Sequence, residues 1–399
     1  MPLSKKNAFI IIKLFGLWHI GVFLKIKHIL AIPVAIPVKR VGYFSRARRT
    51  AALRTIVKIE CDNGIEGIGE TRGIHAASII NDKFEVLLKD KEITGPASMR
   101  LLCLPKSVDY GYPDQLIEQS AYTAIDMAIL DCMGKYINTP LYNLIGGKYR
   151  DKARFVAYEY SNDPEKSLID SEIPSYMATK LLEARNSTGS NFVEFKVGTN
   201  SIMTDIKTVA EVRSALGADI KIGVDANMAW DFDTAETFIR ETTPFNLANI
   251  EEPVSDLNSM DKLARRYNVN ISSHCTSIEL LSNYKHIDGA VGEPHAEGSM
   301  LGCRDLSERL SAIGKRYWFR SVWEAGISWS AMCHMFISFP VLNRPMQALI
   351  NHLKDDLIQE EDYEMVNGGV KVPNRPGLGV TLDNKAVEKY RIDKGVHPL

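Results

Sequence analysis

The stretch IKIGVDAN, residues 220–227, is an apolar run that stops abruptly at a carboxylate, Asp225. About one strand–helix unit later, NLANIEEP, residues 246–253, does the same at Glu251. If both runs are neighbouring parallel strands, the two carboxylates lie at the same rim of one sheet. Asp225 and Asn227, two residues apart, are spaced as metal ligands or as caps of a turn.

The same alternation of apolar runs and amphipathic stretches continues on both sides of these two strands. Helical spacing is clearest in the stripe of Met260, Leu263, Ala264 and Tyr267. Eight strands alternating with helices predict a (β/α) barrel or a doubly wound sheet. We favour the barrel because none of the strands is followed by G-x-G-x-x-G, the turn of a nucleotide-binding sheet. The expected strands are residues 153–161, 191–198, 220–227, 246–253, 268–274, 289–295, 316–322 and 344–350.

Active sites of barrels lie at the C-terminal ends of the strands, so the polar residue that ends each apolar run is a candidate. Neighbouring strands lie about 4.8 Å apart, so residues at successive strand ends are expected side by side. The candidates in chain order are Lys196, Asp225, Glu251, His274, Glu293 and Ser321.

Two carboxylates and a lysine on three successive strands indicate a specific chemistry. A single Asp at a strand end is usually a cap, but repetition at Glu251 favours a site for a hard divalent cation held by Asp225 and Glu251. Desolvation and a nearby cation disfavour the ammonium form of Lys196, which makes this lysine a candidate general base. The alternative for Lys196 is a salt bridge to Asp225. A base beside a carboxylate-binding cation predicts abstraction of the proton alpha to that carboxylate.

The bulk composition excludes several other classes of protein. The chain has 399 residues, 45% hydrophobic and 24% charged, with 48 basic and 49 acidic residues. These proportions are those of a soluble globular protein. The short basic group Arg46, Arg48 and Arg49 is interpreted as a solvated loop, so no nucleic-acid partner is expected. Six scattered cysteines without C-x-x-C spacing favour a reducing, cytoplasmic location.

The N-terminal residues 8–24 form an apolar stretch that Lys13 and His19 interrupt. The stretch is short and polar for a transmembrane helix. We interpret it as an extension outside the fold, in preference to a targeting segment or an integral part of the domain, and we expect no membrane partner. The expected organisation is an extension over 1–24, an α+β capping domain over 25–150, a barrel over 151–355 and a segment returning to the capping domain over 356–399.

The most specific motif is AYTAIDMAILDCMGKYINTPLYNLIGG, residues 121–147. Together with VDAN, IEEP and the closing VPNRPGLGV, residues 372–380, it resembles the enolase superfamily. The resemblance is to the mandelate racemase and muconate lactonizing enzyme branch, nearest the glucarate dehydratase type. It implies a (β/α)7β barrel, a capping domain built from both chain ends, Mg²⁺ held by Asp225 and Glu251, and a homo-oligomer.

The resemblance also implies a lyase that acts on a small carboxylate. The leading hypothesis is dehydration of an acid sugar to a 2-keto acid with Lys196 as the base. The alternatives are an attenuated homologue that binds an organic acid and a lyase or cycloisomerase that uses Lys196 alone. A zinc-dependent barrel hydrolase ranks below these.

Capping-domain loops shape substrate specificity in this superfamily. That property points to residues 39–48 and 69–77 of this chain. Tyr43, Arg72 and His75 in these two stretches are therefore candidates for substrate contacts.

Two departures from the family pattern concern the base and the metal. Relatives carry K-x-K on the second barrel strand, whereas this chain has Glu194 two residues before Lys196. The two side chains share a face of the strand, and a carboxylate stabilises the charged form of the lysine. His274 stands where relatives have an acidic or amide ligand. Imidazole suits Zn²⁺, Mn²⁺ or Fe²⁺ better than Mg²⁺, so His274 is either a ligand or a hydrogen-bonded neighbour.

A third departure concerns the opposite face of the site. Many relatives use a histidine on the seventh strand and an aspartate on the sixth. Here Glu293 keeps a carboxylate, but Ser321 replaces the histidine. Racemisation and histidine-dependent dehydration are both in doubt for this reason. His295 fits the D-P-H pattern of the glucarate type and is, with Asn227, a further candidate for contact with the substrate.

Overall fold

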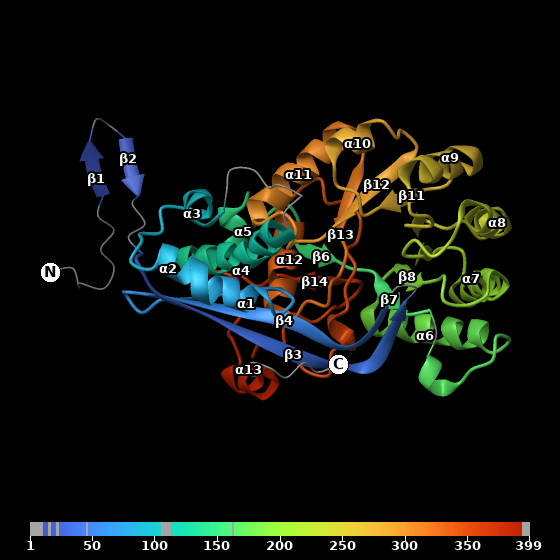
Figure 1. Cartoon of the computed structure of the whole chain (residues 1–399), viewed down its shortest axis with the longest axis horizontal. Coiled ribbons are helices and arrows are strands. Elements are labelled where there is room, and N and C mark those ends of the chain that lie inside the picture. Colours follow the sequence, from blue (N-terminus) through green and yellow to red (C-terminus); the bar gives the residue numbers. More distant parts are fainter. Residues whose placement is uncertain are drawn as a thin grey trace.

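The computed structural model describes residues 11–14, 17–20, 24–44, 47–104, 113–161 and 163–392. Its centre is a parallel sheet whose strands follow one another in chain order. The sheet curls with its helices on the outside (Figure 1), as the sequence predicts. The strands are β7 (Ala157–Glu159), β8 (Phe192–Lys196), β9 (Lys221–Asp225), β10 (Asn249–Glu251), β11 (Ile271–Ser273), β12 (Ile287–Gly292) and β13 (Arg316–Phe319).

The expected eighth strand, residues 344–350, is wrong as a regular strand, although this segment closes the barrel. Gln347 N donates to Phe319 O at the end of β13 (3.0 Å), and Met346 N donates to Arg154 O (2.9 Å). Pro345 has no N–H to contribute to a ladder, and the chain turns into the 3-10 helix η4 (Ile350–His352) directly afterwards. The two edges of the sheet are therefore joined by an irregular segment.

Helices follow the strands and bury their apolar stripes against the sheet. Met260, Leu263 and Ala264 are buried, as their spacing predicts. Side chains at helix N-termini accept backbone N–H bonds, for example Asp231 from Thr234. The helices are α6 (Ile173–Thr188), α7 (Ile202–Leu216), α8 (Phe232–Thr242), α9 (Leu257–Tyr267), α10 (Ile278–Ser282), α11 (Met300–Ala312) and α12 (Gly326–Ser338), with 3-10 turns η2 (Pro164–Lys166) and η3 (Thr243–Phe245).

The capping domain combines an antiparallel sheet with helices. A turn with Gly64 at φ +82° lies between its second and third strands. The small residues of its long helix allow close packing on the sheet, because a Cβ on Gly69 would lie 1.9 Å from Ala124 O. The elements are β3 (Ile26–Phe44), β4 (Ala47–Cys61), β5 (Glu66–Arg72), α1 (Ala76–Ile79), the π-helical η1 (Ile80–Phe84), α2 (Glu85–Leu88), α3 (Pro96–Cys103), α4 (Pro113–Tyr136) and α5 (Leu141–Leu144).

The long β3–β4 hairpin reaches the barrel: Arg40 of β3 pairs with Glu159 of β7, with Nη2 and Oε2 2.5 Å apart. The C-terminal segment contacts both parts of the molecule. Its strand β14 (Gly369–Lys371) pairs with β6 (Lys152–Arg154), and its helix α13 (Asn384–Tyr390) packs on β3.

The N-terminal stretch contains a two-stranded antiparallel hairpin, β1 (Ile11–Leu14) and β2 (Leu17–Ile20). These two strands pair with each other and are drawn apart from the capping domain in Figure 1. Residues 1–10, 15–16 and 21–23 lie outside the described residues, so the expected boundary at residue 24 stays a prediction. Within the described ranges, no helix is long and apolar enough to cross a membrane.

Candidate active site

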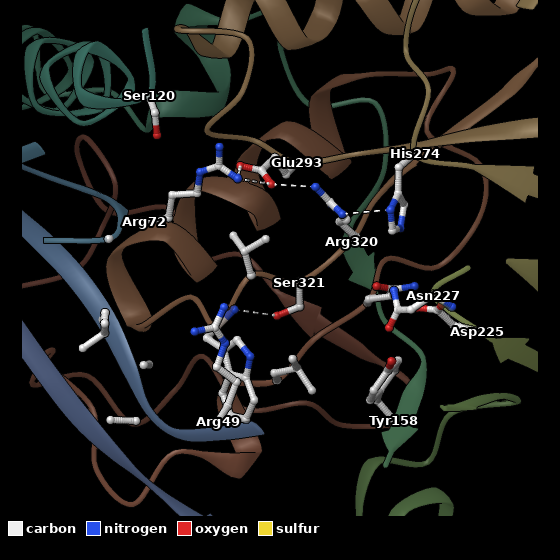
Figure 2. Close-up of a pocket in the computed structure, with 18 of the residues that line it drawn as sticks. Arg49, Arg72, Ser120, Tyr158, Asp225, Asn227, His274, Glu293, Arg320 and Ser321 are labelled. Atoms are coloured by element: carbon white, nitrogen blue, oxygen red, sulfur yellow. Dashed lines mark hydrogen bonds and ion pairs between the residues drawn. The ribbon is translucent and has the colours of Figure 1, made fainter. Parts of the chain in front are cut away.

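A cavity of about 480 Å³ opens at the C-terminal ends of the barrel strands, where the capping domain covers them. Residues of β4, β5 and α1 line one part of it, and the strand ends line the rest. Figure 2 shows Arg49 and Arg72 on one side of the cavity and Asp225 and Asn227 on the other.

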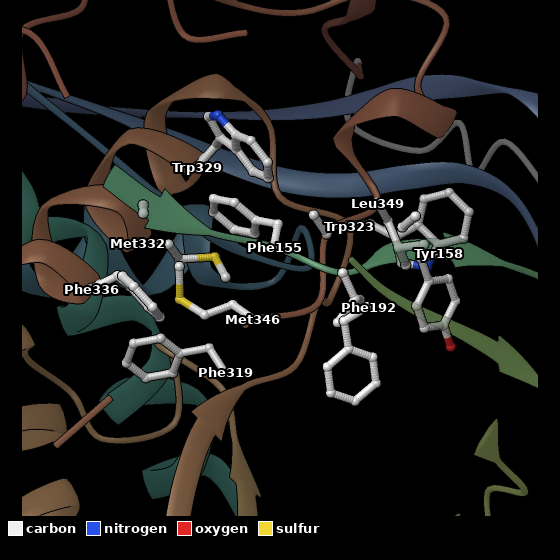
Figure 3. Packing of buried hydrophobic residues seen from close by; sticks show 14 of the residues in the cluster. Phe155, Tyr158, Phe192, Phe319, Trp323, Trp329, Met332, Phe336, Met346 and Leu349 are labelled. Atoms are coloured by element: carbon white, nitrogen blue, oxygen red, sulfur yellow. The ribbon is translucent and has the colours of Figure 1, made fainter. Parts of the chain in front are cut away.

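Part of the cavity wall is apolar and continuous with the core. Figure 3 shows Tyr158, Trp323 and Leu349, which line the cavity, near the cluster around Phe155. Phe155 stacks on Trp329 of α12 with ring centroids 4.0 Å apart. Close packing of this kind holds the polar groups of the rim on a rigid support.

The two predicted carboxylates lie side by side. Asp225 and Glu251 are register partners in the β9–β10 pair, and Lys196 is the partner of Asp225 in the β8–β9 pair. Asp225, Glu251 and His274 each present a possible ligand atom, and these atoms lie within 4.8 Å of one another. Two carboxylate oxygens and an imidazole nitrogen are a suitable donor set for a divalent cation.

Lys196 donates to the carboxylate of Asp225 and to the amide oxygen of Asn227. The salt bridge considered from the sequence is therefore present. Asn227 N also donates to Asp225 Oδ1 (2.8 Å), and Asn227 adopts φ +48°. Asn tolerates this left-handed conformation better than most residues. The turn after β9 therefore places the amide of Asn227 beside the lysine.

Burial and charge act in opposite directions on the two carboxylates. Burial, reinforced by the charge of Asp225, raises the pKa of Glu251 to about 8. Burial also acts to raise the pKa of Asp225, but the charges of Lys196 and His274 and the hydrogen bonds from Lys196 and Asn227 outweigh it, so this pKa lies below its ordinary value. Each of the two buried acids disfavours ionisation of the other. A cation bound between them would remove this repulsion, so the pair favours cation binding.

Both ring nitrogens of His274 have partners. Nε2 lies 3.0 Å from Glu251 Oε1, and Nδ1 lies 3.1 Å from Arg320 Nη1. Burial and the charge of Arg320 lower the pKa of His274 to about 4, so the imidazole is neutral at pH 7.

The other wall of the cavity is built around Glu293. Its Oε1 lies 2.8 Å from Nη1 of Arg72, from the capping domain, and its Oε2 lies 3.0 Å from Nη2 of Arg320. Ser321 lines the same wall and donates to Oε2 of the buried Glu324 at 2.6 Å. This wall therefore carries a carboxylate between two guanidinium groups and a hydroxyl bound to a second acid.

Two family models match the chain. The mandelate racemase / muconate lactonizing enzyme N-terminal domain matches residues 31–146, and the enolase C-terminal domain-like model matches residues 176–386, more than half of the chain. The chain belongs to the mandelate racemase/muconate lactonizing enzyme family. The resemblance noted in the sequence is thus confirmed, and with it the barrel and its capping domain.

Curated relatives and solved structures are similar along most of the chain. Muconate cycloisomerase 1-1 of Acinetobacter lwoffii is 24% identical over 380 residues, 90% of this chain and 94% of the relative. Arabinonate dehydratase of Saccharolobus solfataricus is 25% identical over 350 residues, 84% and 89% of the two chains. The crystal structure of an enolase from Pseudomonas fluorescens with bound magnesium, potassium and tartrate has a TM-score of 0.81 at 22% identity and covers 93% of this chain and 92% of that chain.

Most of the predicted site residues of this family member line the cavity. Lys196, Asp225, Glu251, His274 and Glu293 do so from the strand ends. The remaining residues that line it as predicted are Asn227, Ser321, Arg72 and His75.

Glu194, predicted from the sequence to share a face with Lys196, lies away from the cavity. Its side chain is fully buried and does not line the cavity. Arg344 Nη2 donates to its Oε2 (2.9 Å), and Gln347 Nε2 donates to its Oε1 (2.5 Å). Both partners come from the irregular segment that closes the barrel. The carboxylate of Glu194, which was expected to stabilise the charged form of Lys196, is therefore paired with the guanidinium of Arg344.

His295 and Tyr43 do not line the cavity, so their predicted contact with the substrate stays a prediction without support from the cavity. His295 is fully buried, and its Nε2 lies 2.9 Å from Nη2 of Arg54, a buried residue of β4. Tyr43 lies under the guanidinium of Arg48, 5.8 Å from the ring centroid. The stretch 39–48, expected as a specificity loop, is mostly the end of the β3–β4 hairpin, and residues 45–46 lie outside the described residues.

Several lining residues were not predicted, among them the polar residues Arg49, Arg320 and Gln347. Arg49 was assigned to a solvated loop, because nothing local shows that β4 runs under the barrel mouth. Arg320 directly precedes Ser321 and follows the apolar run 317–319, so its strand-end position could have identified it. Gln347 lies inside the apolar part of the eighth expected strand, between Met346 and Ala348, so its position in the sequence gives no strand-end signal.

Proposed function

We propose that this enzyme is a lyase that removes the proton alpha to the carboxylate of an acid sugar, with Lys196 as the base. The beta hydroxyl would then leave as water with the proton that Lys196 has accepted, and the enol that forms tautomerises to a 2-keto acid. Asp225 and Glu251 would hold the divalent cation that the family uses. Bound there, a cation polarises the substrate carboxylate and stabilises the negative charge that develops on it.

The observation that carries this proposal is the grouping of Lys196, Asp225 and Glu251 on three consecutive strands, in register, at one cavity. The names of two relatives, arabinonate dehydratase and muconate cycloisomerase, support chemistry on a carboxylate substrate. The magnesium bound in the Pseudomonas fluorescens structure supports Mg²⁺ as the ion.

The residues of the chain have separate tasks in this reaction. Lys196 must release its own proton and its contact with Asp225 before its Nζ can accept the alpha proton. Asn227 holds Nζ at the rim while this happens. The apolar wall near Tyr158 and Trp323 limits the access of water.

The opposite wall favours elimination on one face over racemisation. Racemisation needs a proton-transfer group on each face of the substrate. On the far side Glu293 is held by Arg72 and Arg320, and Ser321 is bound to Glu324. A serine hydroxyl is not a base at neutral pH without activation.

The test is exchange of the alpha proton for deuterium in a library of acid sugars, with and without Mg²⁺. Lys196→Ala should abolish both exchange and formation of a keto acid. Lys221→Ala is the matched control, because Lys221 is exposed at the opposite end of the neighbouring strand β9. Exchange that survives in Lys196→Ala would assign the base to another residue.

A second candidate is an attenuated homologue that binds an organic acid, and the Ser321 wall without a histidine favours it. Tight binding of acid and metal with no exchange for any acid would support this alternative. A cycloisomerase using Lys196 alone would instead give a lactone, which product analysis separates from a keto acid.

A further inference from the structure

The imidazole of His274 lies between the guanidinium of Arg320, which can only donate, and the carboxyl group of Glu251. Its Nδ1 faces Arg320 Nη1 at 3.1 Å, and its Nε2 faces Glu251 Oε1 at 3.0 Å. A guanidinium has no acceptor atom, so Nδ1 must present its lone pair to Arg320. In a neutral imidazole the ring proton is then on Nε2, which donates to Glu251 Oε1.

We propose that Arg320 is a positioning residue that holds His274 as the Nε2–H tautomer, so that His274 orients Glu251 and is not a ligand of the cation. A metal ligand must offer a nitrogen lone pair. In this arrangement the lone pair of Nδ1 is taken by Arg320, and Nε2 carries the proton. The proposal rests on the candidate cation site of the proposed function but not on the reaction performed there.

Arg320 is itself held in place from two directions. Its backbone N donates to Gly292 O at the end of β12 (2.8 Å), and its Nη2 donates to Glu293 Oε2 (3.0 Å). Glu293 is in turn paired with Arg72 of the capping domain. An arginine stays charged over the whole physiological range. The donor facing His274 is therefore permanent, whereas a neutral partner could exchange roles with the ring.

The acceptor side is equally constrained. Gln347 Nε2 donates to Glu251 Oε2 (2.9 Å), which leaves Oε1 facing the imidazole. The backbone of His274 is fixed as well, because its N donates to Glu252 Oε1 (2.5 Å). Rotating the ring to present Nδ1 to the cation would break both ring contacts and leave the Arg320 guanidinium facing a ring edge with no acceptor.

The consequence is a cation site in which the protein supplies oxygen atoms alone, from Asp225 and Glu251. Mg²⁺ is usually held by one or two carboxylates and keeps several waters, whereas imidazole favours Zn²⁺. His274 therefore does not convert the site to a zinc site, despite its place in the sequence. Removing Arg320 frees Nδ1 for the proton, and the ring can then offer Nε2 as a ligand.

The tautomer is measured directly in metal-free protein labelled with ¹⁵N-histidine. The signal of His274 is assigned by its disappearance in His274→Gln. We expect a proton coupled to Nε2 and none coupled to Nδ1. A proton on Nδ1, or rapid exchange between the two tautomers, would overturn the proposal whatever the enzyme catalyses.

Coordination is measured with Mn²⁺ as the probe, by electron spin echo modulation of the bound ion. We expect no modulation from a directly bound nitrogen in the wild-type protein, and a ¹⁴N coupling of a ligated imidazole would refute the inference. A protein that fails to bind Mn²⁺ refutes the proposed function, while the tautomer is still decided by the labelled spectrum.

The role of Arg320 is tested by metal competition. In Arg320→Met we expect the ratio of Zn²⁺ to Mg²⁺ affinity to rise on the order of tenfold or more, the lower end of the effect of groups behind metal ligands. Arg316→Met is the matched control, since Arg316 starts the same strand and pairs with Asp288, away from the cavity. An unchanged ratio in a folded Arg320→Met protein would contradict the positioning role. If this variant does not fold, the ¹⁵N spectrum and the Mn²⁺ spectrum of the wild-type protein still test the tautomer and the coordination.

Discussion

The two walls of the cavity carry similar residue types but differ in what those residues can do. On the β8–β10 wall, Lys196 lies against Asp225 and Asn227, and all three line the cavity. On the β12–β13 wall, Glu293 is held between Arg72 and Arg320. A lysine amine at a cavity rim is a possible general base, whereas both oxygens of Glu293 are engaged by guanidinium groups. Proton transfer is therefore expected from one wall, and fixed charge from the other.

The largest expected effect tests this division directly. Lys196→Ala should slow deuterium exchange at the alpha carbon by about 10²–10⁴-fold, the usual contribution of a general base. Ser321→Ala, on the other wall, should change the rate by less than roughly tenfold, because its hydroxyl is already bound to Glu324. Equal losses in the two variants would mean that both walls transfer protons.

The second effect concerns the buried ion pair between Glu194 and Arg344, which involves the same strand as Lys196. Arg344→Met leaves Glu194 buried without its cation, which should reduce the free energy of unfolding by about 3–5 kcal/mol. Glu194→Gln in the same protein should restore much of the loss, because no uncompensated charge remains. Denaturant unfolding measures both variants, and a double variant as unstable as Arg344→Met alone would show that packing, and not charge, is responsible.

The third effect compares carboxylate and imidazole at the candidate cation site. Asp225→Asn should weaken Mg²⁺ binding by more than roughly a hundredfold, since residues behind metal ligands already contribute about 10–100-fold. His274→Ala should weaken it by only about tenfold, because the ring acts through Glu251. Calorimetric titration with Mg²⁺ ranks the two variants, and a larger loss in His274→Ala would make the imidazole a ligand.

The smallest expected effect concerns Asp126, a buried acid away from both walls of the cavity, and how it changes the free energy of unfolding with pH. Burial raises the pKa of Asp126 in α4 to about 7, and its Oδ2 accepts from Met300 N at the start of α11 (2.9 Å). Between pH 4 and 7 the folded protein keeps a proton that the unfolded chain releases. The free energy of unfolding from this group therefore falls as pH rises to about 7 and is constant above it.

Asp126→Asn keeps the size and the acceptor oxygen of this side chain without the charge. The variant should be more stable than the wild type at pH 8, on the order of 2 kcal/mol, and similar to it at pH 4. Unfolding curves at the two pH values measure the difference, and an equal difference at both would assign the effect to something other than ionisation.

The relative positions of residues at the ends of consecutive strands could be predicted from the sequence. Asp225 and Glu251 end consecutive strands, so the regular spacing of parallel strands places them together. Residues that depend on distant segments could not be assigned. Glu194 was expected at the catalytic face, and only the closure of the barrel brings Arg344 and Gln347 to its oxygens.

The sequence alone predicted a barrel with Lys196 beside two acids, because strand periodicity and strand-end position are local properties. The motif at residues 121–147 carried the resemblance that implied the family and the capping domain. The tertiary structure alone decided which charges are paired, that Arg49 reaches the barrel mouth, and that Arg320 contacts His274. The physical reason is that ion pairs and hydrogen bonds depend on distances of about 3 Å between groups far apart in the chain, and only packing of the whole molecule sets those distances.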